Sequence, residues 1–213
     1  MKFLFSVFFF TITSLLPAAA QCVCFKCLLF QHKSFQVVSS AMAPAIDTGQ
    51  CGIATLVDGA SVKIERGSVV AYTAERNEKV TMLFRVIGIA GDDVQMIDGI
   101  PFLNGVKVEQ SQTEDYAFLR PEGGNQPRCR NSVSNHGSCL ADRFRETLPN
   151  GKSYDVLNIT LSTGDNTPVY SVPEGHVFVL GDNRDNSNDS RFMKPSGQGF
   201  IPVERIFGIF EDF

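Results

Sequence analysis

The sequence of 213 residues has no tryptophan and no run of lysine or arginine. Lys and Arg number 19 against 23 Asp and Glu, so the formal net charge at pH 7 is −4. Nucleic-acid binding through a basic patch is therefore not expected. The chain also lacks a segment of ten or more residues with helical periodicity, which argues against a helical fold. It contains no internal repeat and no low-complexity tract.

Short segments rich in β-branched and apolar residues occur throughout the chain after residue 33. Asp98-Gly99 and Asn104-Gly105 predict two hairpin turns around a short apolar segment, and Asn150-Gly151 predicts a further turn. The fold class that these patterns predict is mainly β, with antiparallel sheet, in one globular unit. The predicted strands are residues 52–57, 68–73, 80–90, 93–97, 169–172 and 176–181.

The N-terminal segment differs from this β-rich sequence. Lys2 is followed by an apolar stretch from Phe3 to Leu16, then by Pro17 and three alanines that end at Ala20. This order is typical of a secretory signal that is cleaved after the last alanine. The same segment is just long enough for an uncleaved membrane anchor. Both alternatives place the rest of the chain outside the cytoplasm, either in the periplasm or anchored in the cytoplasmic membrane.

Six cysteines are present, and in an exported protein they can form disulfides. Cys129 and Cys139 enclose a short polar segment and are the best candidates for a pair. Cys24 and Cys27 have the C-x-x-C spacing of metal or redox sites. We predict no metal there, because no second pair stands at zinc-finger spacing and no strand–helix context surrounds them. The pairing of the other four cysteines stays open.

The most polar stretch of the chain, GDNRDNSNDSR at residues 181–191, directly follows a predicted strand. A loop of Asx turns would explain its Asp and Asn residues. Turn chemistry alone does not require Arg184 and Arg191 among three Asp, so we favour a rigid hydrogen-bonded turn. Such a turn would hold a hydroxyl, for example that of Ser187, toward a neighbouring group.

This stretch resembles, without a gap, the last signature box of bacterial type I signal peptidases, the serine-lysine proteases that remove export signals. RVIGIAGDDV, residues 85–94, is similar to that family's preceding box, and SSAMAPAI, residues 39–46, is similar to the box around its nucleophile. The likeness extends from about residue 34 to residue 213. Residues 193–198, MKPSGQ, lengthen the loop that follows the last box.

The resemblance implies an antiparallel signal-peptidase-like core with an inserted β-rich excursion and an N-terminal apolar segment. The implied divisions are residues 1–30 as signal or anchor, 31–107 as the first part of the core, 108–170 as the insert with Cys129 and Cys139, and 171–213 as the second part of the core. No metal and no cofactor are implied.

The family's two reacting side chains are both absent. In that family a serine hydroxyl attacks the scissile carbonyl and a neutral lysine accepts its proton. The nucleophile position is Ala41, and the general-base position is Phe84. The hydroxyl that holds the oxyanion maps to Ser39, and the serine that orients the lysine maps to Ser187. The matching scaffold residues are Met42, Pro44, Arg85, Gly91, Asp92, Gly181, Asp182, Asn183, Arg184, Asp189, Ser190 and Arg191.

Neighbouring side chains are poor substitutes for the missing pair. In an extended segment Ser40 faces away from the side of Ala41, and Ser39 is displaced along the chain by two residues. A displacement of about 1 Å can cost about 100-fold in rate. Lys79 is five positions before Phe84, on the opposite face of a regular strand. Other bases would have to arrive from elsewhere in the chain: Lys63 or His136.

Three functions are compatible with this sequence. The favoured one is an envelope protein related to signal peptidase I that is proteolytically impaired or inactive but still binds extended peptides with small residues, of the Ala-x-Ala kind. The second is an active signal or pilin-processing peptidase with a displaced nucleophile. The third is a non-catalytic structural subunit of an envelope assembly. An experiment with such a peptide distinguishes the three. Binding without cleavage supports the first function, cleavage supports the second, and the absence of both supports the third.

Overall fold

The computed structural model describes residues 22, 24–29, 31–120, 126–132 and 137–210, and it confirms a mainly β, antiparallel fold. Fifteen strands form over these residues, with three short 3₁₀ helices: η1 (Lys26–Leu29), η2 (Arg184–Asn186) and η3 (Val203–Arg205). Each of the six predicted strands is present, and its observed ends lie within one residue of the predicted ones.

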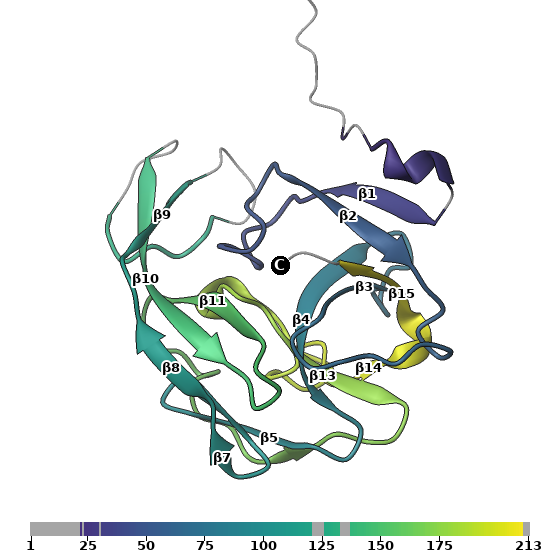
Figure 1. Cartoon of the computed structure of the whole chain (residues 1–213). Helices are drawn as coiled ribbons and strands as arrows, with labels where there is room; N and C mark the ends of the chain where they lie inside the picture. Colours follow the sequence, from purple (N-terminus) through teal and green to yellow (C-terminus); the bar gives the residue numbers. More distant parts are fainter. Residues whose placement is uncertain (1–21, 23, 30, 121–125, 133–136, 211–213) are drawn as a thin grey trace, which may run out of the picture.

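The largest sheet has seven strands in the order β1–β2–β15–β3–β4–β13–β14 (Figure 1). Its strands come from both ends of the sequence, because β15 pairs with both β2 and β3. Residues that follow the last signature box are thereby built into the middle of the sheet. The strands are β1 (His32–Gln36), β2 (Cys51–Leu56), β3 (Val69–Thr73), β4 (Thr81–Ile89), β13 (His176–Leu180), β14 (Ile201–Pro202) and β15 (Ile206–Phe210).

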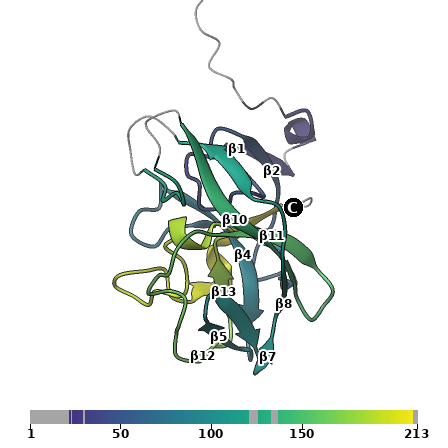
Figure 2. The same ribbon diagram turned by 90° about the vertical axis from the view of Figure 1, so that its left-hand side faces the viewer.

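Two smaller sheets complete the fold. One has the order β12–β5–β6–β7, and in the other β10 pairs with β8, β9 and β11. Figure 2 shows β10 and β11 crossing beside β4 and β13. The strands are β5 (Asp93–Ile97), β6 (Ile100–Leu103), β7 (Val106–Lys107), β8 (Glu109–Gln112), β9 (Tyr116–Leu119), β10 (Ser138–Thr147), β11 (Ser153–Asn158) and β12 (Tyr170–Ser171).

Both predicted hairpin turns form around β6. Asp98 and Gly99 have φ values of 50° and 77°, and Asn104 and Gly105 have values of 54° and 78°. Two consecutive residues with positive φ match the right-handed twist of the flanking strands, and Asx-Gly pairs adopt this conformation at low cost. Local sequence therefore determines the β5–β6–β7 meander.

Several of the strands that sequence patterns missed are polar, or are paired with distant partners. β1 has the sequence HKSFQ and β8 has EQSQ, so neither shows an apolar alternation. β15, IFGIF, is short and directly follows η3. Its partners β2 and β3 lie more than a hundred residues earlier in the chain, which no local pattern indicates.

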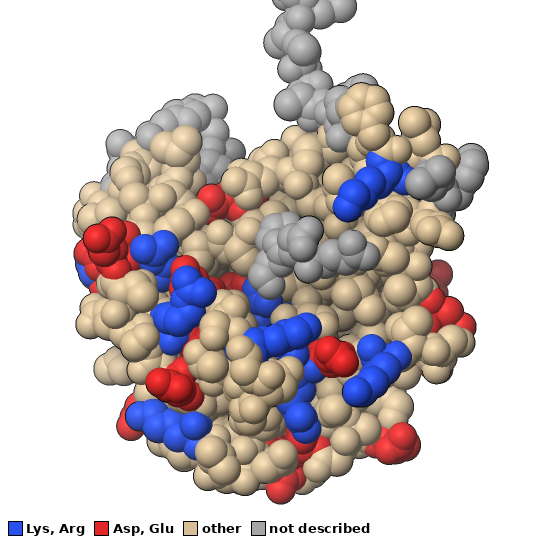
Figure 3. All heavy atoms as spheres, in the orientation of Figure 1, with Lys and Arg blue, Asp and Glu red and all other residues tan. Residues whose placement is uncertain are grey.

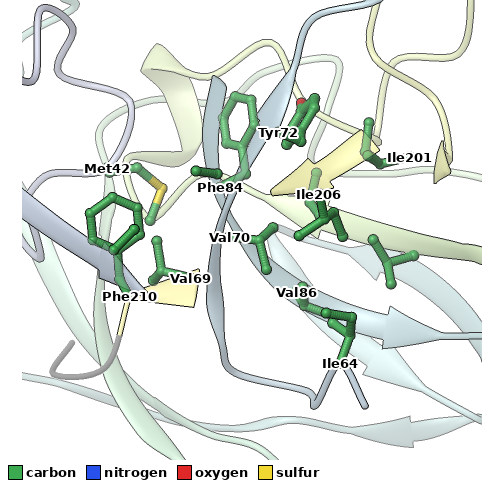
Figure 4. Packing of buried hydrophobic residues seen from close by; sticks show 14 of the residues in the cluster. Met42, Ile64, Val69, Val70, Tyr72, Phe84, Val86, Ile201, Ile206 and Phe210 are labelled. Atoms are coloured by element: carbon green, nitrogen blue, oxygen red, sulfur yellow. The ribbon is translucent and has the colours of Figure 1, made fainter. Parts of the chain in front are cut away.

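Strand β4 is buried on both faces, which explains its almost continuous apolar sequence. Phe84 and Val86 pack into one core, with residues from β3, β13 and β15 (Figure 4). Ile87 packs into a second core, where Phe178 and Tyr154 meet the smaller sheets. Because successive strand residues point to opposite faces, β4 joins the two cores.

Charges of both signs are interspersed on the surface. Figure 3 shows Lys and Arg among Asp and Glu over the described part of the face drawn in Figure 1.

All six cysteines are paired. Cys129 is bonded to Cys139, Cys22 to Cys51, and the C-x-x-C residues Cys24 and Cys27 to each other. The predicted signal or anchor falls mostly on residues 1–21, outside the described residues. Across the described parts of the chain, no helix has the length and apolar character needed to cross a membrane.

Replacing Cys129 and Cys139 together by serine should lower the free energy of unfolding by about 2–3 kcal/mol, because the disulfide closes a loop in the unfolded chain. Urea denaturation measures this change. The matched control is the Cys24→Ser, Cys27→Ser double variant. It opens a shorter loop, with a sequence separation of 3 instead of 10, and should cost less. Free thiols at Cys129 and Cys139 in a non-reducing peptide map would contradict the expectation.

Candidate functional site

A small groove brings together Ala41, Phe84 and Ser39, the residues that the resemblance assigns to the nucleophile, the general base and the oxyanion hydroxyl. It has a volume of about 110 Å³ and lies between the segment that follows β1 and the first half of β4. Most of its wall is apolar, and no lysine or histidine lines it. The lining residues are Phe35, Gln36, Val37, Val38, Ser39, Ala41, Met42, Thr81, Met82, Leu83 and Phe84.

Phe84 belongs to the protein core as well as to the groove. Its residue surface is 2% exposed, and it pairs across the sheet with Val70. Its ring centroid lies 6.3 Å from that of Tyr72, and Figure 4 shows it between Met42 and Tyr72. An aromatic ring at this position adds apolar contacts and requires no buried partner for a charge.

The segment around Ala41 consists of turns, not of an extended strand. The Ala43 N–H donates to the Ser40 carbonyl at 3.1 Å, and the Ile46 N–H donates to the Met42 carbonyl at 2.9 Å. The strand alternation used to place the Ser40 side chain therefore does not apply, although Ser40 does not line the groove, as that argument expected. Met42 is 2% exposed and anchors the segment in the core.

Ser187 contacts the backbone of the Ala41 segment and does not line the groove. Its hydroxyl lies 2.7 Å from the Asn183 carbonyl oxygen and 3.1 Å from the Ala41 carbonyl oxygen, both of which are acceptors. The Asn183 N–H donates to the same Ala41 carbonyl at 3.0 Å. Residues 181–191, called the polar box from here on, thus fix the backbone at Ala41.

Gly181 permits this close approach. A Cβ atom added there would overlap the Ser187 hydroxyl and would lie 2.7 Å from the Ala41 carbonyl oxygen. Any side chain at this position would separate the box from the Ala41 segment. The position therefore requires glycine because no room exists for a Cβ atom, not because of its backbone φ angle.

Three buried arginines make bidentate or near-bidentate ion pairs that hold the box. Arg85 donates to both carboxylate oxygens of Asp182 at 2.8 and 2.7 Å. Arg191 donates to both oxygens of Asp189 at 2.8 and 3.0 Å, and Asp189 also accepts the Gly181 N–H. The box therefore forms the rigid hydrogen-bonded turn that its composition indicates.

The third arginine, Arg184, pairs with Glu146 of β10, which the sequence analysis missed. Its two terminal nitrogens donate to the two Glu146 oxygens at 3.0 and 2.6 Å, and both residues are buried. Burial lowers the pKa of the Arg184 guanidinium, but the Glu146 charge raises it, and the net pKa is above the ordinary value. The Arg184 guanidinium therefore stays charged. Glu146 is separated from Arg184 by 38 residues of mostly polar sequence, so no local pattern singles it out.

The middle box is held in the same manner at its Gly91-Asp92 turn. The Asp92 carboxylate accepts two hydrogen bonds from Arg66, at 2.7 and 2.6 Å, one from Asn104 and one from the Ile89 N–H. Burial raises the pKa of Asp92, but these hydrogen bonds outweigh it and lower the net pKa below the ordinary value of 3.8.

The other candidate bases do not reach the groove. The Lys63 side chain is 84% exposed and lies 3.7 Å from Glu65. Lys79 is exposed in a turn before β4, so the strand argument made for it does not apply. His136 lies outside the described residues. Within the described ranges, no group of three or more His, Cys, Asp or Glu residues could hold a metal.

The sequence profile of the family described as "Signal peptidase, peptidase S26" matches residues 9–211. The chain belongs to this signal peptidase family. Two similar relatives, both named Signal peptidase I, come from Rickettsia typhi and Rickettsia bellii. The first is 34% identical over 151 residues, which are 68% of this chain and 49% of the relative. The second is 36% identical over 149 residues, 67% of this chain and 44% of the relative.

This signal peptidase family member thus spans about half the length of the curated relatives it matches. A crystal structure of a signal peptidase I from Enterococcus faecalis V583 is 21% identical and covers 70% of this chain and 98% of its own, with a TM-score of 0.38. At that score the structural likeness has no weight, and family membership rests on the sequence match.

Replacing Glu146 by glutamine should lower the free energy of unfolding by about 3–5 kcal/mol, because it leaves the Arg184 charge buried without a counter-charge. The matched control is Arg145→Gln on the same strand. Arg145 is half exposed and pairs with Asp155, so its loss should cost less than about 1 kcal/mol. Urea denaturation of both variants tests this, and equal effects would show that the buried pair is not special.

Replacing Asp92 by asparagine should weaken the acid dependence of stability. A carboxylate with a lowered folded pKa stabilises the folded protein above its unfolded pKa, and this stabilisation is lost as pH falls through the folded value. Stability of the parent protein should therefore decline below about pH 3.8, and the variant should lose less over that range. Denaturation midpoints between pH 7 and pH 2.5, with exposed Asp98→Asn as the control, measure the difference. Parallel curves for parent and Asp92→Asn would contradict it.

Proposed function

We propose that this signal peptidase family member binds extended peptides in the groove beside Ala41 and does not hydrolyse them. The observation that carries the proposal is the composition of the groove. A methyl group and a buried phenyl ring stand where the family has an attacking hydroxyl and a proton-accepting amine. Without these two groups the groove has no hydroxyl at the attacking position, although Ser39 and Thr81 line it, and no amine or imidazole that could accept a proton.

Free strand edges beside the groove support peptide binding. β4 pairs with β3 from Thr81 to Arg85, but its pairing with β13 begins only at Arg85. Among the described residues, the segment 81–84 therefore has no strand on its second side. β1, which pairs only with β2, ends next to the groove. An extended peptide can add a strand at such an edge through backbone hydrogen bonds.

The shape of the groove favours small side chains. Its volume of about 110 Å³ is well below that of sites for drug-sized molecules, typically 300–1,000 Å³. Val37, Leu83 and Met42 make it apolar. Peptides with alanine at alternating positions, as in Ala-x-Ala, would place both methyl groups on the same face of the added strand.

The N-terminal segment supports a location outside the cytoplasm. Its apolar sequence is that of a cleaved signal or an anchor, and the three disulfides belong to an oxidising compartment. We therefore place the β domain in the periplasm or on the outer side of the cytoplasmic membrane, where exported precursors present their signal peptides.

A binding experiment with the full chain in detergent tests the proposal. A fluorescent extended peptide containing Ala-x-Ala should bind saturably and be recovered intact by mass spectrometry. The same peptide with N-methylated backbone amides is the matched control and should bind at least about tenfold more weakly, because strand addition needs those N–H groups. Cleavage by the purified chain would instead indicate a displaced nucleophile. If the peptide is neither bound nor cleaved, the result favours a structural subunit.

Restoring both reacting groups should restore some hydrolysis. In the Ala41→Ser, Phe84→Lys double variant, the buried site lowers the pKa of the introduced amine, so that the neutral base is available near neutral pH. Activity should rise with pH as that amine loses its proton. The measurement is the release of product from the same peptide.

The controls separate chemistry from packing. Each single variant should be inactive, and so should Ala41→Ser with Phe84→Met, which changes the ring without adding an amine. An inactive double variant that still folds and binds peptide would show that the groove no longer has the geometry for catalysis.

A further inference from the structure

A second pocket, which shares no lining residue with the groove, lies at the C-terminal end of β3. It has a volume of about 240 Å³ and is formed by the chain from Tyr72 to Arg76, by residues 194–198 and by the segment around β14. None of its lining residues lines the groove beside Ala41. One wall is the lengthened loop MKPSGQ, so the pocket exists because of a feature in which this chain departs from the family's pattern.

Three cations and one carboxylate line this pocket. Lys194 lies 2.5 Å from Glu75, and each of these side chains is about half exposed. Arg76 and Arg205 have no hydrogen bond and no ion pair within the described part of the chain, yet both act on the same carboxylate. The hydrogen bond and charge of Lys194, together with the charges of Arg205 and Arg76, lower the pKa of Glu75. The pocket therefore has two positive charges in excess, in a protein whose net charge is negative.

Two hydrogen bonds fix the wall of the pocket. The Asn188 amide donates to the Ser196 carbonyl at 3.2 Å, and the Gln198 N–H donates to the Asp189 carbonyl at 3.4 Å. These bonds attach the loop to the polar box. The buried Tyr72 hydroxyl, 3.4 Å from the Gln198 side-chain oxygen, reaches the pocket between its charged rim and the core.

Apolar residues line the remaining side. Ile201 and Phe200 belong to the wall, and Figure 4 shows Ile201 next to Tyr72 on the side away from Phe84. The pocket thus offers cations and hydrogen-bonding groups beside an apolar surface. This is the usual composition of a site for a small organic ligand.

We propose that this pocket binds a phosphate group attached to a small organic body. Two excess positive charges match a phosphate better than a carboxylate, and arginine guanidinium groups suit its oxygens geometrically. The volume of about 240 Å³ accommodates a glycerol-sized body and is too small for a typical drug-sized molecule. The phosphate can belong to a free metabolite or to a phospholipid headgroup.

The test uses the full chain with two kinds of probe, in detergent for the free ligands and after removal of the detergent for the vesicles. Glycerol 3-phosphate, with inorganic phosphate beside it, represents a free ligand. Vesicles of phosphatidylglycerol, with phosphatidylcholine vesicles beside them, represent a headgroup. Calorimetry or an NMR titration measures the first kind, and co-sedimentation measures the second. Saturable binding of glycerol 3-phosphate indicates a free ligand, and binding of phosphatidylglycerol vesicles alone indicates a headgroup.

Three variants make the assignment to this pocket. Arg76→Gln and Arg205→Gln should each weaken binding of the successful probe about tenfold, the value of one charge-assisted hydrogen bond. Glu75→Gln should strengthen it about threefold, because it removes the one negative charge. The matched control is Lys79→Gln, an exposed cation in the same β3–β4 connection that does not line the pocket. It should change binding less than about twofold.

Two results would overturn the proposal. One is that neither probe shows binding that is weakened by replacing Arg76 or Arg205. The other is an equal loss in the Lys79→Gln control, which would show that general surface charge attracts the phosphate. Because no pocket residue lies in the groove, peptide binding should be unchanged in all of these variants, and the two proposals succeed or fail separately.

Discussion

The buried ion pair between Arg85 and Asp182 is the interaction on which the rest of this structure depends. Both side chains are 1% exposed, and they join β4 to the turn that follows β13. The Arg85 guanidinium also donates to the Gly67 carbonyl and lies 4.3 Å from the centre of the Tyr154 ring in β11. A pair so fully removed from water must keep both partners, because a single remaining charge would cost about 3–5 kcal/mol.

The polar box transmits this constraint to the groove. Asp182 stands between Gly181, whose lack of a side chain admits the Ala41 carbonyl, and Asn183, whose N–H binds that carbonyl. The scaffold therefore fixes a backbone position without regard to the side chain that it presents. The contacts that fix this backbone are therefore independent of the Ala41 methyl group. A lone lysine at position 84 would face a desolvation cost with no catalytic partner, whereas a ring contributes to the core.

Local sequence predicted those elements whose cause is local. The strands ending at Asp98-Gly99 and starting after Asn104-Gly105 follow from turn residues that accept positive φ, and β4 and β13 follow from dense apolar patterns. The polar strands β1 and β8 were missed, since what selects them is a partner strand and not their own composition. In the site, the ordered boxes indicated Ala41 and Phe84, which line one groove, whereas the strand geometry assumed around Ser40 is replaced by turns.

The sequence by itself determined the antiparallel β class and the family, because these depend on residue type and local order. Only the tertiary structure decided that Glu146 neutralises Arg184, that Arg66 holds Asp92, and that the 193–198 loop closes a charged pocket. The physical reason is that these contacts join residues brought together by chain folding. Charge pairing acts through space at a few ångströms, and it leaves no periodic trace along the sequence.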